Sequence, residues 1–142
     1  MRGWKLTCAA IGAAMTLGAC STDPDEVSAG LATLPPKVSV VAIETLELGR
    51  LYEGYMLTAF ATAPGAGYYQ PELRIRYGGR QAVDGFYEYD FLVLPPENPS
   101  EFANAPVAAR QVRADIELPV DMLRGAAGVR VWSDRDSVEG RF

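Results

Sequence analysis

The sequence predicts an all-β fold, an antiparallel β-sandwich of about seven strands. From residue 37 onward, apolar and polar side chains alternate in short runs, which is typical of strands with one buried face. Turn-forming residues separate these runs, and the chain holds 14 glycines and 10 prolines. No segment keeps a helical apolar period over about ten residues. Short strands without a long helix favour a sandwich or a small barrel, and the sandwich is the preferred interpretation.

Four strands are predicted in the first half of this domain, each from alternation or from β-branched residues. In the third strand, Leu73, Ile75 and Tyr77 alternate with charged side chains, so one face is expected to be buried. Gly49 and Arg50 are predicted to turn the chain between the first two strands. The four strands are expected at residues 38–48, 52–62, 72–77 and 85–94.

The second half begins with a long connection, Glu97–Ala109, because Pro99, Asn104 and Pro106 all interrupt regular structure there. The strand after it shows the most regular alternation in the chain. The remaining predicted elements are strands at residues 111–118, 129–132 and 138–142, and one helical turn at 119–125 with Met122 and Leu123 facing inward.

Residues 114–133 contain a strand, a proline-containing turn and a second strand with the sequence Val129-Arg130-Val131. This order is similar to the crossing between the two sheets of immunoglobulin-like domains. The resemblance implies an immunoglobulin-like sandwich, and it covers a pattern of elements rather than a sequence motif.

The N-terminus has the pattern of an export signal. Arg2 and Lys5 are followed by an apolar run, Leu6–Ala19, in which Cys8 is the one ionisable side chain. A helix of about 14 residues rises only about 21 Å, whereas the hydrocarbon core of a bilayer is about 30 Å thick. The run therefore predicts a cleaved signal peptide and not a transmembrane helix.

The end of this run, Leu17-Gly18-Ala19-Cys20, resembles the lipobox of bacterial lipoprotein precursors. The resemblance implies cleavage before Cys20, a diacylglycerol thioether on its sulfur, and acylation of its new amino group with a fatty acid such as palmitate. Ser21 is similar to the residues that permit transfer to the outer membrane, which implies a periplasm-facing protein anchored there. The alternative is an ordinary secretory signal that leaves Cys20 as a free thiol.

Three parts of the chain are expected on this basis: a signal peptide at residues 1–19, a flexible tether at 20–36 that carries the lipid on Cys20, and the sandwich at 37–142. Small and polar residues dominate the tether, which ends in Pro35-Pro36. As a flexible coil it has a root-mean-square span of roughly 20–25 Å.

The charge balance is acidic. Without Arg2 and Lys5, the 13 basic side chains of the chain become 11, against 18 acidic ones, which is a net charge of about −7. Such a surface does not attract nucleic acid or anionic headgroups. The lipid on Cys20 is therefore the expected contact with the membrane, because each buried CH₂ contributes about 0.8 kcal/mol.

The chain has no histidine and only two cysteines. Histidine-dependent nucleophilic catalysis and imidazole zinc sites are therefore excluded. Removal of Cys8 with the signal peptide and acylation of Cys20 leave no pair for a disulfide. No cofactor and no metal site are predicted, and the protein is not expected to be an enzyme.

Glu88 and Asp90 are a candidate carboxylate pair, with a structural role as the alternative. They are predicted on one strand face about 7 Å apart, a spacing that suits a carboxylate pair for glycoside hydrolysis or a calcium site. The favoured interpretation is an exposed strand face paired with arginines such as Arg74 and Arg76.

Two further groups are interpreted as turns. Asp134, Asp136 and Glu139 lack the glycine and the ligand spacing of a calcium loop, so a solvated turn is favoured. The segment Gly65–Gly67 has no lysine and no helix after it, so it is not a phosphate-binding loop.

Aromatic residues supply the candidate binding positions. Tyr68 and Tyr69 follow a glycine-rich loop and are a candidate binding tip, although folding back over the end of the sheet is the favoured interpretation. Trp132 faces away from Val129 and Val131, so it is expected either in a second packing layer or at a surface contact.

The favoured function is a lipid-anchored cell-envelope protein that acts as a non-catalytic binding or assembly module. Its expected partners are the membrane, through Cys20, and an envelope protein or glycan. The alternatives are a carboxylate-dependent envelope hydrolase and a structural accessory of an outer-membrane complex.

Overall fold

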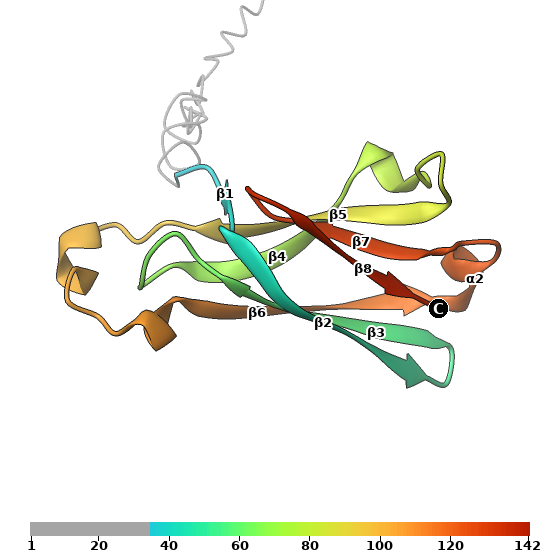
Figure 1. Cartoon of the computed structure of the whole chain (residues 1–142), viewed down its shortest axis with the longest axis horizontal. Helices are drawn as coiled ribbons and strands as arrows, with labels where there is room; N and C mark the ends of the chain where they lie inside the picture. The colour runs from blue at the N-terminus through green and yellow to red at the C-terminus, as the bar shows by residue number, and fades with distance from the viewer. Residues whose placement is uncertain (1–34) are drawn as a thin grey trace, which may run out of the picture. The chain divides into compact units, whose positions relative to one another are not determined.

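The computed structural model describes residues 35–142, and it confirms the predicted all-β sandwich-like fold (Figure 1). In this part of the chain, eight strands form two sheets, and one short α-helix and three 3₁₀ turns connect them. The predicted signal peptide, Cys20 and most of the predicted tether lie outside the described residues. Within residues 35–142, no helix has the length and apolar character needed to cross a membrane.

The first sheet has three antiparallel strands in the order β2-β3-β6. Its strands are β2 (Ala42–Leu51), β3 (Gly54–Thr62) and β6 (Gln111–Pro119). On β3, Leu57, Ala59 and Ala61 are fully buried and alternate with residues on the outer face. The central strand therefore contributes three of the six buried core residues that lie on the strands of this sheet.

The second sheet is built around β5, which pairs with three other strands. Its members are β1 (Val38–Ser39), β4 (Tyr69–Ile75), β5 (Phe86–Leu94), β7 (Gly128–Trp132) and β8 (Ser137–Arg141). The β5–β7 pair is parallel, which differs from the purely antiparallel sheets that were predicted. Parallel neighbours need a long crossover, and residues 95–127 supply it by passing through β6 in the other sheet.

The helical elements are short. The predicted helical turn is present as α2 (Val120–Leu123), and Met122 and Leu123 pack against the core as expected. The 3₁₀ turns are η1 (Tyr77–Gly79), η2 (Pro99–Phe102) and η3 (Val107–Arg110). The predicted sheet-to-sheet crossing at residues 114–133 is also present, because β6 and β7 belong to different sheets.

The first predicted strand is divided between the two sheets. The Val40 N–H donates to Phe91 in the second sheet, whereas the Val41 N–H donates to Thr62 in the first. The chain therefore changes sheets between these two residues, a step that hydrophobic alternation does not reveal.

Two predicted boundaries are wrong. The chain turns at Tyr52 and Glu53 rather than at Gly49 and Arg50, because β2 stays paired with β3 as far as Leu51. The third strand ends at Ile75, and Tyr77 lies in η1 with a φ of 53°. A side chain in this left-handed region is strained, and Tyr77 is 62% exposed rather than buried.

The core lies between the two sheets and contains no charged residue among its fully buried members. Small alanines on β3 and β6 share it with Tyr89 and Phe91 of β5, so that small and large side chains complement one another. Its buried members are Val40, Ile43, Leu57, Ala59, Ala61, Ala63, Leu73, Tyr89, Phe91, Val93, Ala114, Leu118, Val129 and Val131.

The strand pairing defines two ends of the sandwich (Figure 1). We call the end where the described chain begins the proximal end; it carries the connections at residues 63–68, 95–110 and 133–136. The opposite, distal end carries the β2–β3 turn, the β4–β5 loop, the connection at residues 120–127 and Phe142.

Gly128 is predicted to be intolerant of a side chain. A Cβ at this position would lie 2.1 Å from the carbonyl oxygen of Gly140 and 3.0 Å from the Phe86 ring. We expect Gly128→Ala to lower the free energy of unfolding by about 1–3 kcal/mol in urea denaturation. Gly49→Ala is the control, because its Cβ would meet neighbours only at 3.9–4.0 Å. Equal stabilities of the two variants would contradict the close packing of β7 against β8.

Tyr89 is predicted to make the stability of the sandwich sensitive to alkaline pH. Burial, followed by repulsion from Tyr87, raises the pKa of Tyr89 to about 12. The folded protein then holds a proton that the unfolded chain releases near pH 10, so stability present below pH 10 is lost between about pH 10 and 12.

Tyr89→Phe should remove this loss. Between pH 9 and 11.5, the free energy of unfolding of the variant should fall by about 2 kcal/mol less than that of the wild type. Tyr52→Phe is the control, because the Tyr52 side chain is fully exposed. If Tyr89→Phe and the wild type lose stability in parallel, the assignment to Tyr89 is wrong.

Candidate functional site

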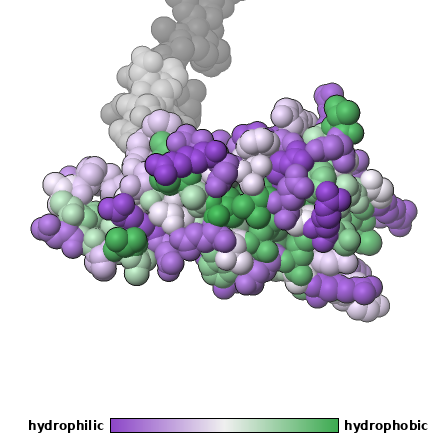
Figure 2. Space-filling view, in the orientation of Figure 1, coloured by the Kyte–Doolittle hydropathy of each residue, from purple (hydrophilic) through white to green (hydrophobic). Residues whose placement is uncertain are grey.

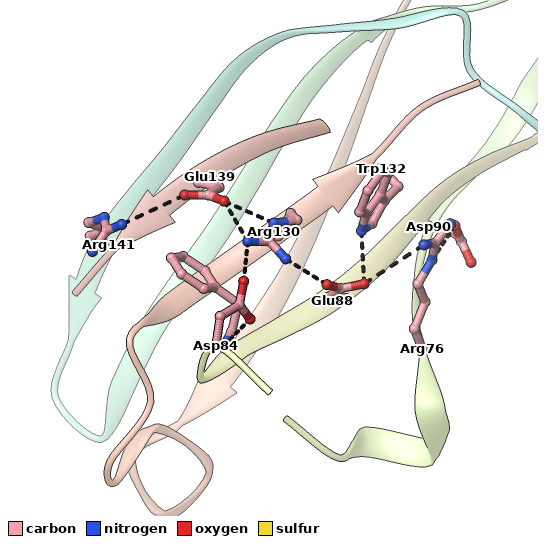
Figure 3. A network of polar contacts seen from close by, with 9 residues as sticks. Arg76, Asp84, Glu88, Asp90, Arg130, Trp132, Glu139 and Arg141 are labelled. Atoms are coloured by element: carbon pink, nitrogen blue, oxygen red, sulfur yellow. Dashed lines mark hydrogen bonds and ion pairs between the residues drawn. The ribbon is translucent and has the colours of Figure 1, made fainter. Parts of the chain in front are cut away.

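The sequence candidates Glu88, Asp90 and Trp132 meet on the outer face of the five-stranded sheet (Figure 3). They belong to a group of charged and aromatic side chains that we call the outer-face cluster. Its members are Arg76, Asp84, Phe86, Glu88, Asp90, Arg130, Trp132, Glu139 and Arg141.

Strand register places the centre of this cluster. Glu88 on β5 lies opposite Arg130 on β7, and Arg130 lies opposite Glu139 on β8. Side chains directly opposite one another on one face are close enough to pair. The row of acid, base and acid therefore follows from the parallel β5–β7 pairing together with the antiparallel β7–β8 pairing.

Both carboxylate oxygens of Glu88 accept hydrogen bonds. Arg130 donates to Oε1 at 2.7 Å, and the Trp132 indole N–H donates to Oε2 at 3.0 Å. The Arg76 guanidinium lies 3.8 Å from Oε2. Glu88 is only 5% exposed, so the prediction that it lies on an exposed strand face is wrong. A buried carboxylate is tolerated here because its oxygens are paired and bonded.

Arg130 bonds to three carboxylates of the cluster. It donates to Asp84 and to Glu139, each at 2.6 Å, in addition to Glu88. These bonds, that to Asp84 first, raise the pKa of Arg130, and Arg130 in turn lowers the pKa of Asp84. Within residues 35–142, no group of three or more acidic, histidine or cysteine side chains is placed to hold a metal.

Cation–π contacts complete the cluster. The Arg76 guanidinium lies 4.7 Å from the Trp132 ring and also pairs with Asp90 at 2.5 Å, a bond that raises the pKa of Arg76. The Phe86 ring has Arg130 at 4.7 Å and Arg141 at 5.3 Å. Both aromatic rings are thus covered by guanidinium groups instead of being presented to a ligand.

This geometry favours a structural role for Glu88 and Asp90. A glycosidase acid must be free to protonate a leaving group, whereas each oxygen of Glu88 already accepts a hydrogen bond. The predicted arginine pairing is present for Arg76 with Asp90. It is wrong for Arg74, which pairs with Glu72 on its own strand.

The cluster also holds both ends of the β4–β5 loop, a function that the sequence did not suggest. Arg76 precedes this loop and is bonded to Asp90, and Asp84 follows it and is bonded to Arg130. Tyr77 and Val83, which lie between these two anchors, are 62% and fully exposed respectively. The cluster therefore fixes the base of an exposed loop that presents apolar side chains.

The tyrosine pair lies at the proximal end. Tyr68 is half-buried and packs against the core, and Tyr69 is the first residue of β4, opposite Leu94. Tyr69 also lines a shallow hollow of about 300 Å³ with Gly67 and Phe102, among others. The structure thus places both residues over the end of the sheet and not on a projecting tip.

The late acidic group does not form one site. Asp134 and Asp136 lie in the turn before β8, where the Ser133 hydroxyl is bonded to Asp136 and accepts from the Arg135 N–H. Glu139 lies on β8 and belongs to the outer-face cluster. The interpretation of the first two as a turn agrees with their positions.

Exposed apolar residues at the distal end were missed by the sequence reasoning. Figure 2 shows one such surface over the β4–β5 loop, at the upper right. The distal residues of this kind are Leu51, Tyr52, Tyr77, Val83, Val120 and Phe142. Among them, only Tyr77, next to Gly78, and Val120, next to Pro119, have a glycine or proline neighbour in the sequence, so local composition gave little signal for this surface.

Comparisons with known proteins identify no relative. No protein-family model, no curated protein and no solved structure matches the chain.

Arg130 is predicted to stabilise the fold mainly by pairing with the buried Glu88. Arg130→Met removes the ion-pair partner of the buried Glu88 carboxylate, and we expect the free energy of unfolding to fall by about 3 kcal/mol. Adding Glu88→Gln should restore part of this loss, because the unpaired charge is then gone. The matched control is Arg124→Met, which breaks the exposed pair with Asp121 and should change stability by less than about 0.5 kcal/mol. Equal effects of Arg130→Met and Arg124→Met would contradict the role given to the cluster.

Proposed function

We propose that this protein is a lipid-anchored cell-envelope protein of the outer membrane, and that its sandwich is a non-catalytic binding or assembly module. The observation that carries the anchoring is the segment Leu17–Cys20 behind a charged start and a short apolar run. A lipid on Cys20 would supply the membrane contact that an acidic protein cannot obtain by charge.

The outer-face cluster supports the non-catalytic part of the proposal. Its carboxylates are engaged by Arg76, Arg130 and Trp132, and they hold the β4–β5 loop in place. Among residues 35–142, no buried side-chain nitrogen or oxygen lacks a hydrogen-bond partner. Buried groups that are fully bonded rigidify a scaffold, and a rigid scaffold positions exposed loops for a partner.

Anchoring is tested by comparing the two cysteines of the precursor. We expect the wild-type protein to fractionate with membranes, and mass spectrometry should find a lipid-modified Cys20 as its first residue. Cys20→Ser should abolish both the modification and the membrane fraction, because serine offers no sulfur for a thioether. Cys8→Ser is the control and should behave as wild type, since Cys8 lies in the removed segment.

The proposal fails if Cys20→Ser is processed and fractionates with membranes like the wild type. It also fails if the mature protein carries an unmodified thiol.

A further inference from the structure

The distal end contains a surface hollow formed by the β2–β3 turn and the end of β6, which we call the distal hollow. Its volume is about 540 Å³, and it lies open to solvent. Its lining residues are Leu51, Tyr52, Glu53, Glu117, Leu118 and Pro119. An open hollow buries too little of a small molecule for tight binding, so a segment of a larger partner suits it better.

The walls of the distal hollow are held together by backbone contacts. Gly54 lies opposite Pro119, and the Val120 N–H donates to the Glu53 carbonyl at 3.1 Å. A Cβ on Gly54 would lie 2.1 Å from the Leu118 oxygen, so the absence of a side chain allows this close approach. The turn is thus tied to β6, and a partner would meet a preformed surface.

Apolar side chains at the hollow are exposed to water. Tyr52 is fully exposed and Leu51 is 39% exposed. Covering apolar surface is favourable by about 25 cal/mol per Å², and tyrosine is enriched among the residues that dominate interfaces. The hollow therefore has the composition of a contact surface.

The negative charge at the distal hollow distinguishes between possible binding partners. Glu53 and Glu117 line the same hollow, and neither forms an ion pair within residues 35–142. A second copy docking through this patch with two-fold symmetry would place these carboxylates against one another. An anionic lipid surface would be repelled in the same way. A basic partner is favoured.

We propose that the distal hollow docks a segment of another protein that inserts an apolar side chain and pairs lysine or arginine with Glu53 and Glu117. This inference rests on the proposed function and gives the binding module its partner chemistry. Within the described residues, the chain begins at the proximal end, and the distal hollow lies at the opposite end of the sandwich (Figure 1).

The test uses the full lipidated protein in intact envelopes, with a photoreactive amino acid in place of Tyr52. The control carries the same amino acid in place of Val107, which is 74% exposed at the proximal end and does not line the hollow. We expect one dominant adduct from position 52 and at least a tenfold lower yield from position 107. The attachment site, found by peptide sequencing, should be an apolar residue within three positions of a lysine or arginine.

Charge reversal supplies the second readout. Glu53→Lys with Glu117→Lys should lower the adduct yield from position 52 at least tenfold. Glu97→Lys with Asp134→Lys changes the net charge equally, but at exposed proximal positions, and should leave the yield within twofold of the parent. Circular dichroism melting of each variant separates loss of binding from loss of fold.

Any of four results overturns the inference: no adduct, an adduct with a second copy, an adduct with lipid, or an adduct yield from position 52 that charge reversal at the hollow does not lower. Membrane fractionation of the same samples keeps the two proposals distinguishable. A membrane-bound protein without an adduct contradicts only the docking site, whereas an adduct from protein outside the membrane fraction contradicts only the anchoring.

Discussion

The parallel pairing of β5 and β7 is the constraint on which the rest of the second sheet depends. It places Glu88 beside Arg130 and brings Trp132 within hydrogen-bond distance of the same carboxylate. It also requires the crossover through β6, which joins the two sheets. A purely antiparallel neighbour would have met β5 in the opposite direction and paired different residues with Glu88.

The buried carboxylate is better explained by specificity of register than by added stability. Removing charges from water costs several kcal/mol per ion, and mutual attraction repays this only when the geometry is good. A one-residue slip of β7 would move Val129 and Val131 to the outer face and turn Arg130 into the core. Glu88 would then be buried without its partner, so the correct register is favoured over its nearest alternative.

Sequence patterns predicted local features well because alternation is a local property. The most regular run, predicted at residues 111–118, is β6, and the predicted helical turn is α2. Partners distant in the sequence could not be predicted in this way. The burial of Glu88 depends on Arg130, which lies 42 positions away, and no periodicity within β5 encodes that contact.

The candidate site was predicted only in part, because its residues come from strands that are distant in the sequence. Glu88, Asp90 and Trp132 were each singled out by residue type, but their meeting follows from sheet order. The distal hollow was missed because Gly49 and Arg50 had the composition of a turn, which moved the expected turn away from Tyr52 and Glu53. Close approach of β3 to β6 at Gly54 decides the turn position, and this is a tertiary constraint.

The distribution of charge links the scaffold to the proposed contact surface. The chain has fewer basic than acidic side chains, and the outer-face cluster takes up Arg76, Arg130 and Arg141 in pairs with its own carboxylates. Each acid of the cluster therefore has an arginine partner within the molecule. Glu53 and Glu117 line the distal hollow, and neither forms an ion pair among the described residues. The arginines that fix the sheet are thus engaged by carboxylates of the cluster, whereas the two acids at the distal hollow are left for the proposed basic partner.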